Sequence, residues 1–125
     1  MIYGTGIDLV SIERMERVIL RWGDRFLKRV FTAEEIRFCH CRPCAHAAFA
    51  LRFAAKEAFS KALGLGMRRG VLWRDIEVFH DRAGKPGLKL RGISSKICRT
   101  NGIRGIHLSL SDDGDYGVAV VILEQ

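Results

Sequence analysis

The sequence predicts an α+β fold with a mainly antiparallel sheet and a long central helix. Three observations lead to this prediction. A strand pattern with alternating faces opens the chain, helical segments follow as a group, and two strand pairs joined by turns come after them. Helices that are grouped between strands, and do not alternate with them, are typical of the α+β class. With 125 residues the chain is the size of a single domain, covering 1–125.

The first predicted strand, Tyr3 to Val10, has glycines on one face. Gly4 and Gly6 share that face with Ile2 and Asp8. The opposite face holds Tyr3, Thr5, Ile7 and Leu9. Glycine inside a strand often marks the close approach of another group. Asp8 is the only acidic residue of this strand and needs solvent or a partner, because an unpaired buried carboxylate is costly. The alternative is that Asp8 only caps the helix that follows.

A first helix is predicted from Ser11, a favourable N-cap, to about Trp22. Its apolar positions recur at helical spacing, at Ile12, Met15, Ile19 and Trp22. A separate basic stripe consists of Arg14, Arg17 and Arg21, and the basic character continues at Arg25, Lys28 and Arg29. This stripe is either a docking surface for an acidic partner or simply a solvated face.

The middle of the chain predicts two more helices. Thr32 and Glu35 form a capping box that begins a short helix, and Pro43 should end it. A longer helix runs from about His46 to Leu63, and the glycines of the segment 64–66 end it.

The last part of the chain predicts two hairpins separated by a short helix. The expected elements are strands at Trp73–His80 and Gly87–Arg91, a helix at Ser94–Arg99, and strands at Ile106–Ser111 and Tyr116–Leu123. Turns at 81–86 and 112–115 join the two strand pairs. Short connections of this kind join antiparallel strands, so the sheet is expected to be mainly antiparallel.

Composition limits the classes of function. The net charge of +7 predicts an acidic partner, which could be nucleic acid, an anionic membrane, a phosphorylated cofactor or an acidic protein. The chain shows no secretory leader pattern and no apolar run of the roughly 20 residues that a membrane span needs, so a cytoplasmic location is expected. The cysteines are expected to be free thiols. The segment Cys39–His46 also offers soft ligands for zinc, but its spacing does not match a paired C-x2-C site.

The long helix presents a carboxylate and an ammonium group one turn apart. Glu57 shares its face with Lys61. A different face, which lets another element pack closely, holds Leu51, Ala55, Ala58 and Ala62. The simple interpretation is a solvated Glu57–Lys61 ion pair, worth about 0.3 kcal/mol. The second interpretation joins Glu57 to Asp8, since two carboxylates from distant positions can hold Mg²⁺, and Lys61 could then neutralise a departing phosphate.

Two segments are similar to those of the bacterial holo-acyl-carrier-protein synthases, which are 4′-phosphopantetheinyl transferases. They are GTGID at 4–8 and RFAAKEAFSKALG at 52–64. The similarity continues through WRDIEV at 73–78, GKP at 84–86 and IHLSLS at 106–111, and so covers nearly the whole chain. The pairing of the lysine–glutamate helix motif with the early glycine-x-aspartate is specific, whereas KEAFSK alone would be a weak signal.

The resemblance implies an enzyme that transfers 4′-phosphopantetheine from coenzyme A to a serine of an apo acyl carrier protein and releases adenosine 3′,5′-bisphosphate. It implies that Asp8 and Glu57 bind Mg²⁺, which bridges to the pyrophosphate of coenzyme A. Lys61 would contact that pyrophosphate and assist the departure of the leaving group. Other positions that match coenzyme contacts are Arg52, Ser60, Gly64 and Pro86. Asp8 and a metal-bound water are both open as the base that accepts the serine proton.

The resemblance also implies the macromolecular partners. Acyl carrier proteins are acidic, and the positions that match the docking surface of the family are Arg14, Arg21, Arg25, Phe26 and Arg29. Several positive charges would speed the encounter and make it sensitive to salt. The family forms trimers with active sites between subunits, so a homotrimer is expected here, without a nucleic-acid or membrane partner.

One position departs from the family pattern, and two other functions remain as rivals. Relatives carry a histidine near the coenzyme phosphates where this chain has Asp112, whose charge is unfavourable there.

A basic nucleic-acid-binding module would explain the net charge, but no helix-turn-helix, RRM or zinc-finger pattern is present, and Asp8 and Glu57 stay unexplained. A magnesium-dependent phosphohydrolase would use the same carboxylates with water as the acceptor.

Overall fold

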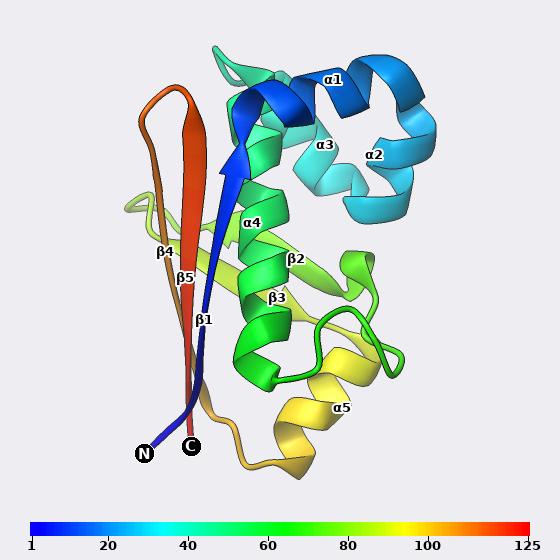
Figure 1. The fold of residues 1–125 in the computed structure, drawn as a ribbon. Helices are drawn as coiled ribbons and strands as arrows, with labels where there is room; N and C mark the ends of the chain where they lie inside the picture. The colour runs from blue at the N-terminus through cyan, green and yellow to red at the C-terminus, as the bar shows by residue number, and fades with distance from the viewer.

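The computed structural model describes residues 1–125 as a long helix packed on a sheet, with a smaller sheet crossing behind the helix (Figure 1). The elements are β1 (Ile2–Ser11), α1 (Ile12–Trp22), α2 (Asp24–Val30), α3 (Ala33–His40), α4 (Ala45–Leu63), β2 (Ile76–His80), β3 (Pro86–Leu90), α5 (Gly92–Thr100), β4 (Gly105–Asp112) and β5 (Tyr116–Glu124). The predicted α+β class with antiparallel sheets and a long central helix is confirmed. No helix combines the length and the apolar character that crossing a bilayer requires.

The larger sheet has the strand order β1-β5-β4 and is antiparallel throughout. Helix α4 covers one face of this sheet, whereas the other face carries no helix (Figure 1). The main hydrophobic core lies between the two and includes Ala58, Ala62, Ala119, Val121 and Leu123. The second sheet consists of β2 and β3 and also contributes to this core, through Ile76 and Val78.

The glycine face of β1 lies directly against α4. A Cβ atom on Gly6 would lie 1.9 Å from the carbonyl oxygen of Ala58, and one on Gly4 would lie 2.1 Å from that of Ala62. Glycine is therefore required for the strand to approach the small residues of the helix, as the sequence predicts. The alternation fails at one point, because a register shift between Ile2 and Gly4 interrupts the pairing with β5 and Ile2 is exposed.

Helix ends agree with the predicted caps, but one predicted strand boundary is wrong and one helix was missed. Ser11 caps α1, and the capping box of Thr32 and Glu35 is present at α3. Helix α3 ends at His40, before Pro43, and the segment Trp73–Asp75 is a short 3₁₀ helix and not the start of a strand. Helix α2 was not expected from its sequence. It forms because Gly23, at a φ of 55°, turns the chain and lets the next residues pack on α1 and α4.

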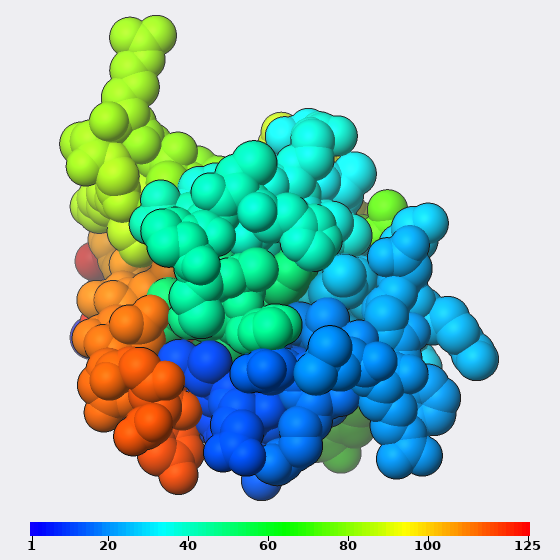
Figure 2. Space-filling view, turned by 90° about the horizontal axis from the view of Figure 1, so that it is seen from above, coloured from blue at the N-terminus to red at the C-terminus, as the bar shows by residue number.

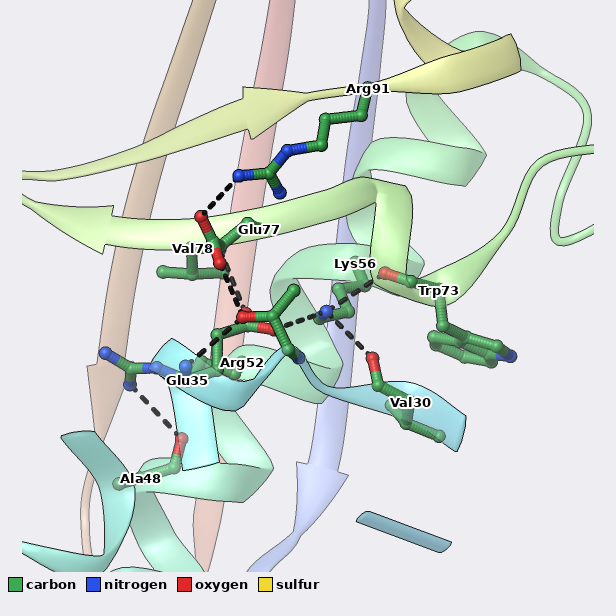
Figure 3. A network of polar contacts seen from close by, with 10 residues as sticks. Val30, Glu35, Ala48, Arg52, Lys56, Trp73, Glu77, Val78 and Arg91 are labelled. Carbon is green, nitrogen blue, oxygen red and sulfur yellow. Dashed lines mark hydrogen bonds and ion pairs between the residues drawn. The ribbon is translucent and has the colours of Figure 1, made fainter. Parts of the chain in front are cut away.

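A buried ion pair fixes α4 to the elements behind it (Figure 3). The side chain of Lys56 is fully buried, and its Nζ donates to Glu35 Oε1 (2.7 Å) and to the carbonyl oxygens of Val30 (2.9 Å) and Trp73 (3.0 Å). Burial lowers the pKa of Lys56, and the Glu35 carboxylate opposes that effect. All three ammonium protons therefore have acceptors from separate elements.

Glu35 and Glu77 extend this network to β2 (Figure 3). The second oxygen of Glu35 accepts from the backbone N–H of Val78 at 3.0 Å. Glu77 accepts from the hydroxyl of Thr32 at 2.5 Å and pairs with Arg91 at 3.5 Å. The network ties α3, α4 and β2 together on the side of α4 that faces away from the larger sheet.

Candidate active site

Asp8 of β1 and Glu57 of α4 face the same hollow. Both residues are half-buried and line a cavity of about 350 Å³, together with Arg14, Phe26 and Phe53. The close contact of β1 with α4 at Gly6 and Ala58 places the two carboxylates next to each other, because Asp8 lies two residues after Gly6 and Glu57 lies one residue before Ala58. The structure thus brings together the two residues that the sequence nominates as metal ligands.

The two carboxylates influence one another. Burial raises the pKa of Glu57, the charge of Asp8 raises it further, and the ammonium group of Lys61 lowers it. The negative charge of Asp8 thus disfavours the ionised form of Glu57, and a cation bound between the two carboxylates relieves this repulsion.

Lys61 pairs with Asp8 and not with Glu57. Its Nζ donates to Asp8 Oδ1 at 3.0 Å and to the carbonyl oxygen of Ile7 at 2.9 Å. Glu57 forms no ion pair within 4.0 Å, so the solvated Glu57–Lys61 pair considered from the sequence is wrong. Lys61 is instead a bridge from α4 to β1, at the rim of the carboxylate pair.

The donor set fits Mg²⁺. This ion prefers one or two carboxylates and fills its other positions with water and phosphate oxygens. Asp8 and Glu57 supply two carboxylates, and the adjoining hollow leaves space for the remaining ligands. No group of three or more histidine, cysteine, aspartate or glutamate side chains is arranged to hold a metal, so a cation at Asp8 and Glu57 would depend on water and substrate for its other ligands.

Two of the predicted coenzyme residues lie in a separate cavity of about 530 Å³. Arg52 and Pro86 line it together with Arg42, His80 and Asp112. Asp112 is therefore beside the predicted coenzyme contacts. A larger cavity of about 610 Å³ lies on the other side of Arg52, against β2 and β3, and neither Asp8 nor Glu57 lines it.

The other two predicted coenzyme residues, Ser60 and Gly64, line neither the carboxylate hollow nor the Arg52 cavity. Ser60 is buried, and its hydroxyl donates to the carbonyl oxygen of Glu57 at 2.7 Å. Gly64 ends α4 in the left-handed conformation, with a φ of 80°, and is exposed. Ser60 thus helps to hold the turn that carries Glu57, and its role in coenzyme binding stays a prediction.

The basic stripe forms one surface over α1 and α2. Arg25, Phe26 and Arg29 line a hollow of about 370 Å³ with Trp22, whose indole ring lies under the Arg21 guanidinium at 5.1 Å. Arg14 extends this surface to the carboxylate hollow. In Figure 2 the residues of α1 and α2, in blue, occupy one side of the face, next to the orange turn between β4 and β5.

The side chains of the cysteine segment do not converge as a group of three or more metal ligands. Cys39 is buried, and burial raises the pKa of its thiol to about 12, which disfavours the thiolate that a metal requires. Cys41 and Cys44 are exposed and form no disulfide in the structure.

Comparisons with known proteins agree with this geometry. A sequence model of the 4′-phosphopantetheinyl transferase superfamily matches residues 4–121. The chain belongs to this superfamily. The match includes Asp8, Glu57 and Lys61, and the family predicted from the sequence is confirmed.

Curated relatives within the superfamily match along their full length. The holo-[acyl-carrier-protein] synthase of Geotalea daltonii is 46% identical over 125 residues, which is 100% of both chains. The holo-[acyl-carrier-protein] synthase of Koribacter versatilis is 48% identical over 124 residues, with 99% of each chain covered.

Solved structures of superfamily members have the same fold. The holo-[acyl-carrier-protein] synthase of Neisseria meningitidis superimposes with a TM-score of 0.92 at 40% identity, covering 100% of both chains. The enzyme of Helicobacter pylori, solved in complex with coenzyme A, gives a TM-score of 0.85 at 32% identity and covers 96% of this chain and 99% of its own.

The sequence did not single out His80 or Phe38, both of which contact Arg52. The Arg52 guanidinium lies over the Phe38 ring at 4.1 Å, and Nη2 of Arg52 is 3.3 Å from Nδ1 of His80. No local pattern in the sequence joins these residues, because they come from α3, α4 and β2. Their association is a property of the tertiary structure alone.

Proposed function

We propose that this protein transfers the 4′-phosphopantetheine group of coenzyme A to a serine of an apo acyl carrier protein, with Mg²⁺ as the cofactor. The observation that carries the proposal is the convergence of Asp8, Glu57 and Lys61 at one site. Full-length similarity to proteins named holo-[acyl-carrier-protein] synthase supports the acceptor, and a relative solved with coenzyme A supports the donor. The released product would be adenosine 3′,5′-bisphosphate.

The residues of the site have distinct roles in this reaction. Asp8 and Glu57 would hold Mg²⁺, which supplies Lewis-acid polarisation of the phosphoryl group that is attacked. Lys61 can turn its ammonium group toward the negative charge that develops on the leaving phosphate, while its contact with the Ile7 carbonyl keeps it near β1. Asp8, or a water held by the metal, would receive the proton of the serine hydroxyl.

The mass of the carrier protein tests the proposal directly. The protein is incubated with an apo acyl carrier protein, coenzyme A and Mg²⁺, and the intact carrier is then weighed by mass spectrometry. A gain of one phosphopantetheine group is expected. Coenzyme A cleavage without a change in carrier mass would instead indicate the phosphohydrolase, and no reaction with several apo carriers from a folded preparation would refute the transferase.

The basic surface of α1 and α2 is proposed to bind the acidic carrier protein. Arg25 is exposed and lies beside Phe26 in the hollow next to the active site. We expect Arg25→Glu to lower kcat/KM for the carrier by about tenfold at low salt, because charge reversal weakens electrostatic steering. The loss should shrink as the salt concentration rises, and KM for coenzyme A should not change.

Arg99→Glu is the matched control for this prediction, since Arg99 is exposed on α5 and outside the basic surface. Equal losses in the Arg25 and Arg99 variants would mean that only overall charge matters, and that α1 and α2 are not a docking surface.

The bare face of the larger sheet is proposed to form a homotrimer. This face is apolar at its centre, where Ile7 and Leu9 of β1 are 60% and 64% exposed. They pair with Val120 and Val118 of β5, which lie on the same face. Because β1 also carries Asp8, subunits that pack on this face would lie close to each active site.

Replacing Ile7 by lysine should dissociate the trimer, because a charge in an apolar interface is costly. Light scattering coupled to size-exclusion chromatography is expected to show a trimer for the wild type and a monomer for Ile7→Lys. Leu20→Lys is the control, since Leu20 is also an exposed apolar residue but lies on α1. A trimer that persists in Ile7→Lys would place the subunit interface elsewhere.

A further inference from the structure

Arg52 is a buried cation without an anionic partner. The residue is only 2% exposed, and no carboxylate lies within ion-pair distance of its guanidinium. Nη1 reaches the Ala48 carbonyl oxygen at a long 3.4 Å, and Nε has no hydrogen-bond partner. Buried charges are normally paired. Because the Arg52 guanidinium has no anionic partner within the chain, we expect it to bind an anion from outside.

His80 is the polar side chain that lies closest to this unpaired charge. Nη2 of Arg52 must be the donor in the 3.3 Å contact, so Nδ1 of His80 accepts and the proton of the neutral ring is on Nε2. The His80 ring stacks on Phe38, with centroids 5.2 Å apart and planes 7° from parallel. Phe38 thus holds both the imidazole and the guanidinium in place.

The charges around this cluster indicate from which side an anion arrives. Arg52, Phe38 and His80 form a wall shared by the cavities of about 530 Å³ and about 610 Å³. The smaller cavity adds Arg42 and Asp112, whereas the larger one adds Lys89 and the two carboxylates of Glu34 and Glu77. The smaller cavity, which also contains Pro86, is therefore the one suited to a phosphate group.

We propose that His80 is a second phosphate ligand beside Arg52, and that it takes up a proton when a phosphate group of the coenzyme binds in the smaller cavity. The inference rests on the proposed function, which makes coenzyme A the ligand. His80 lies at the end of β2 and Asp112 at the end of β4, and both line this cavity. Once protonated, His80 would supply a cationic group to the bound phosphate.

The charged groups around His80 explain the direction of the proton movement. Burial, followed by the charges of Arg52 and Arg42, lowers the pKa of His80, and Asp81 partly opposes them. Asp112 lines the same cavity from β4. When the bound phosphate accepts from Nη2 of Arg52 in place of His80, Nδ1 of His80 is free to take up the proton. The phosphate outweighs the two arginines locally and favours the imidazolium, which donates to a phosphate oxygen.

The sign of the pH dependence follows from these shifts. In the free protein the pKa of His80 lies below that of the unfolded chain, so stability is lost as the pH falls through the window between the two values. Phosphate binding raises the pKa of His80, so binding becomes tighter as the pH falls. Each unit of increase corresponds to about a tenfold gain in affinity.

Two measurements test the proposal with adenosine 3′,5′-bisphosphate as the probe. Carbon–proton NMR of the imidazole groups follows the titration of His80, assigned with His80→Asn, before and after saturation with the probe. We expect the pKa of His80 to rise by about one unit on binding. Calorimetry should show that the affinity of the wild type increases more than that of His80→Asn between pH 8 and pH 5.5, approaching about a tenfold difference once the pH falls below the pKa of His80 in the free protein.

His46→Asn is the matched control, because His46 lies on α4 beside Glu16 of α1 and outside the cavity. It should keep the pH dependence of the wild type, and protonation of the probe itself affects all variants equally. A pKa of His80 that does not move on saturation, or an unchanged pH dependence in His80→Asn, would overturn the inference while the carrier-mass assay still supports the transferase. Absence of any binding by the probe would also overturn the inference, and the carrier-mass assay would decide the transferase separately.

Discussion

Glu57→Gln should reduce the rate of carrier modification by at least about a hundredfold. Changes that only reorient a metal ligand already cost roughly 10–100-fold in metal affinity or activity, so removal of a charged ligand should cost at least the upper end of that range. The amide has the same shape as the carboxylate, so the effect isolates the charge. Steady-state rates measured over a range of Mg²⁺ concentrations should show a higher half-saturating concentration as well as a lower maximum.

The stability of the same variant separates a functional role from a structural one. Because the pKa of Glu57 is raised in the folded protein, the ionised carboxylate opposes folding, and stability falls as the pH rises through the window above 4.5. In metal-free buffer at neutral pH, Glu57→Gln should therefore melt at or above the temperature of the wild type. Glu34→Gln, at an exposed carboxylate on α3, should leave activity unchanged. Full activity of Glu57→Gln would refute the metal assignment.

Lys56→Met should destabilise the fold by about 3–5 kcal/mol, the usual cost of removing one partner of a buried ion pair. Methionine fills a similar space but donates no hydrogen bond, so Glu35 would be left as an uncompensated buried charge. The carbonyl oxygens of Val30 and Trp73 would lose their donor too. Urea unfolding at a fixed protein concentration measures the change, since assembly makes stability dependent on concentration.

Lys96→Met is the matched control, because Lys96 is exposed on α5 and forms no ion pair. Its free energy of unfolding should stay within about 0.5 kcal/mol of the wild type. A Lys56 variant that unfolds within about 1 kcal/mol of the wild type would contradict the role assigned to the network. The double variant Lys56→Met with Glu35→Leu should recover part of the loss, because neither charge of this ion pair remains buried.

Local chemistry made much of the fold predictable. Ser11 and Thr32 have the side chains that cap helices, and the caps form where they were expected. Gly4 and Gly6 predicted the close approach of another element, and the structure shows that this element is α4. Helix α2 was not predicted, because its apolar positions are few and its stability comes from packing on α1 and α4.

The candidate site, like the fold, could be predicted from the sequence only in part. Asp8 and Glu57 stood out because a carboxylate in an apolar strand and a carboxylate on a small-residue helix both need an explanation, and family resemblance joined them. Helical spacing made Glu57 a possible ion-pair partner of Lys61, but the structure pairs Lys61 with Asp8, because the strand brings Asp8 closer. Distances of this kind depend on how β1 sits on α4, which no local pattern encodes.

The sequence by itself determined the α+β class, the caps, the glycine-lined contact of the first strand, and the residue types that could hold Mg²⁺. These follow from periodicities and side-chain chemistry within a few residues of each other. Only the tertiary structure decided that Lys61 pairs with Asp8, that Lys56 is buried among Glu35, Val30 and Trp73, and that Arg52 meets His80. Each of these contacts joins segments far apart in the chain, so it exists only once β1, α3 and β2 have packed around α4.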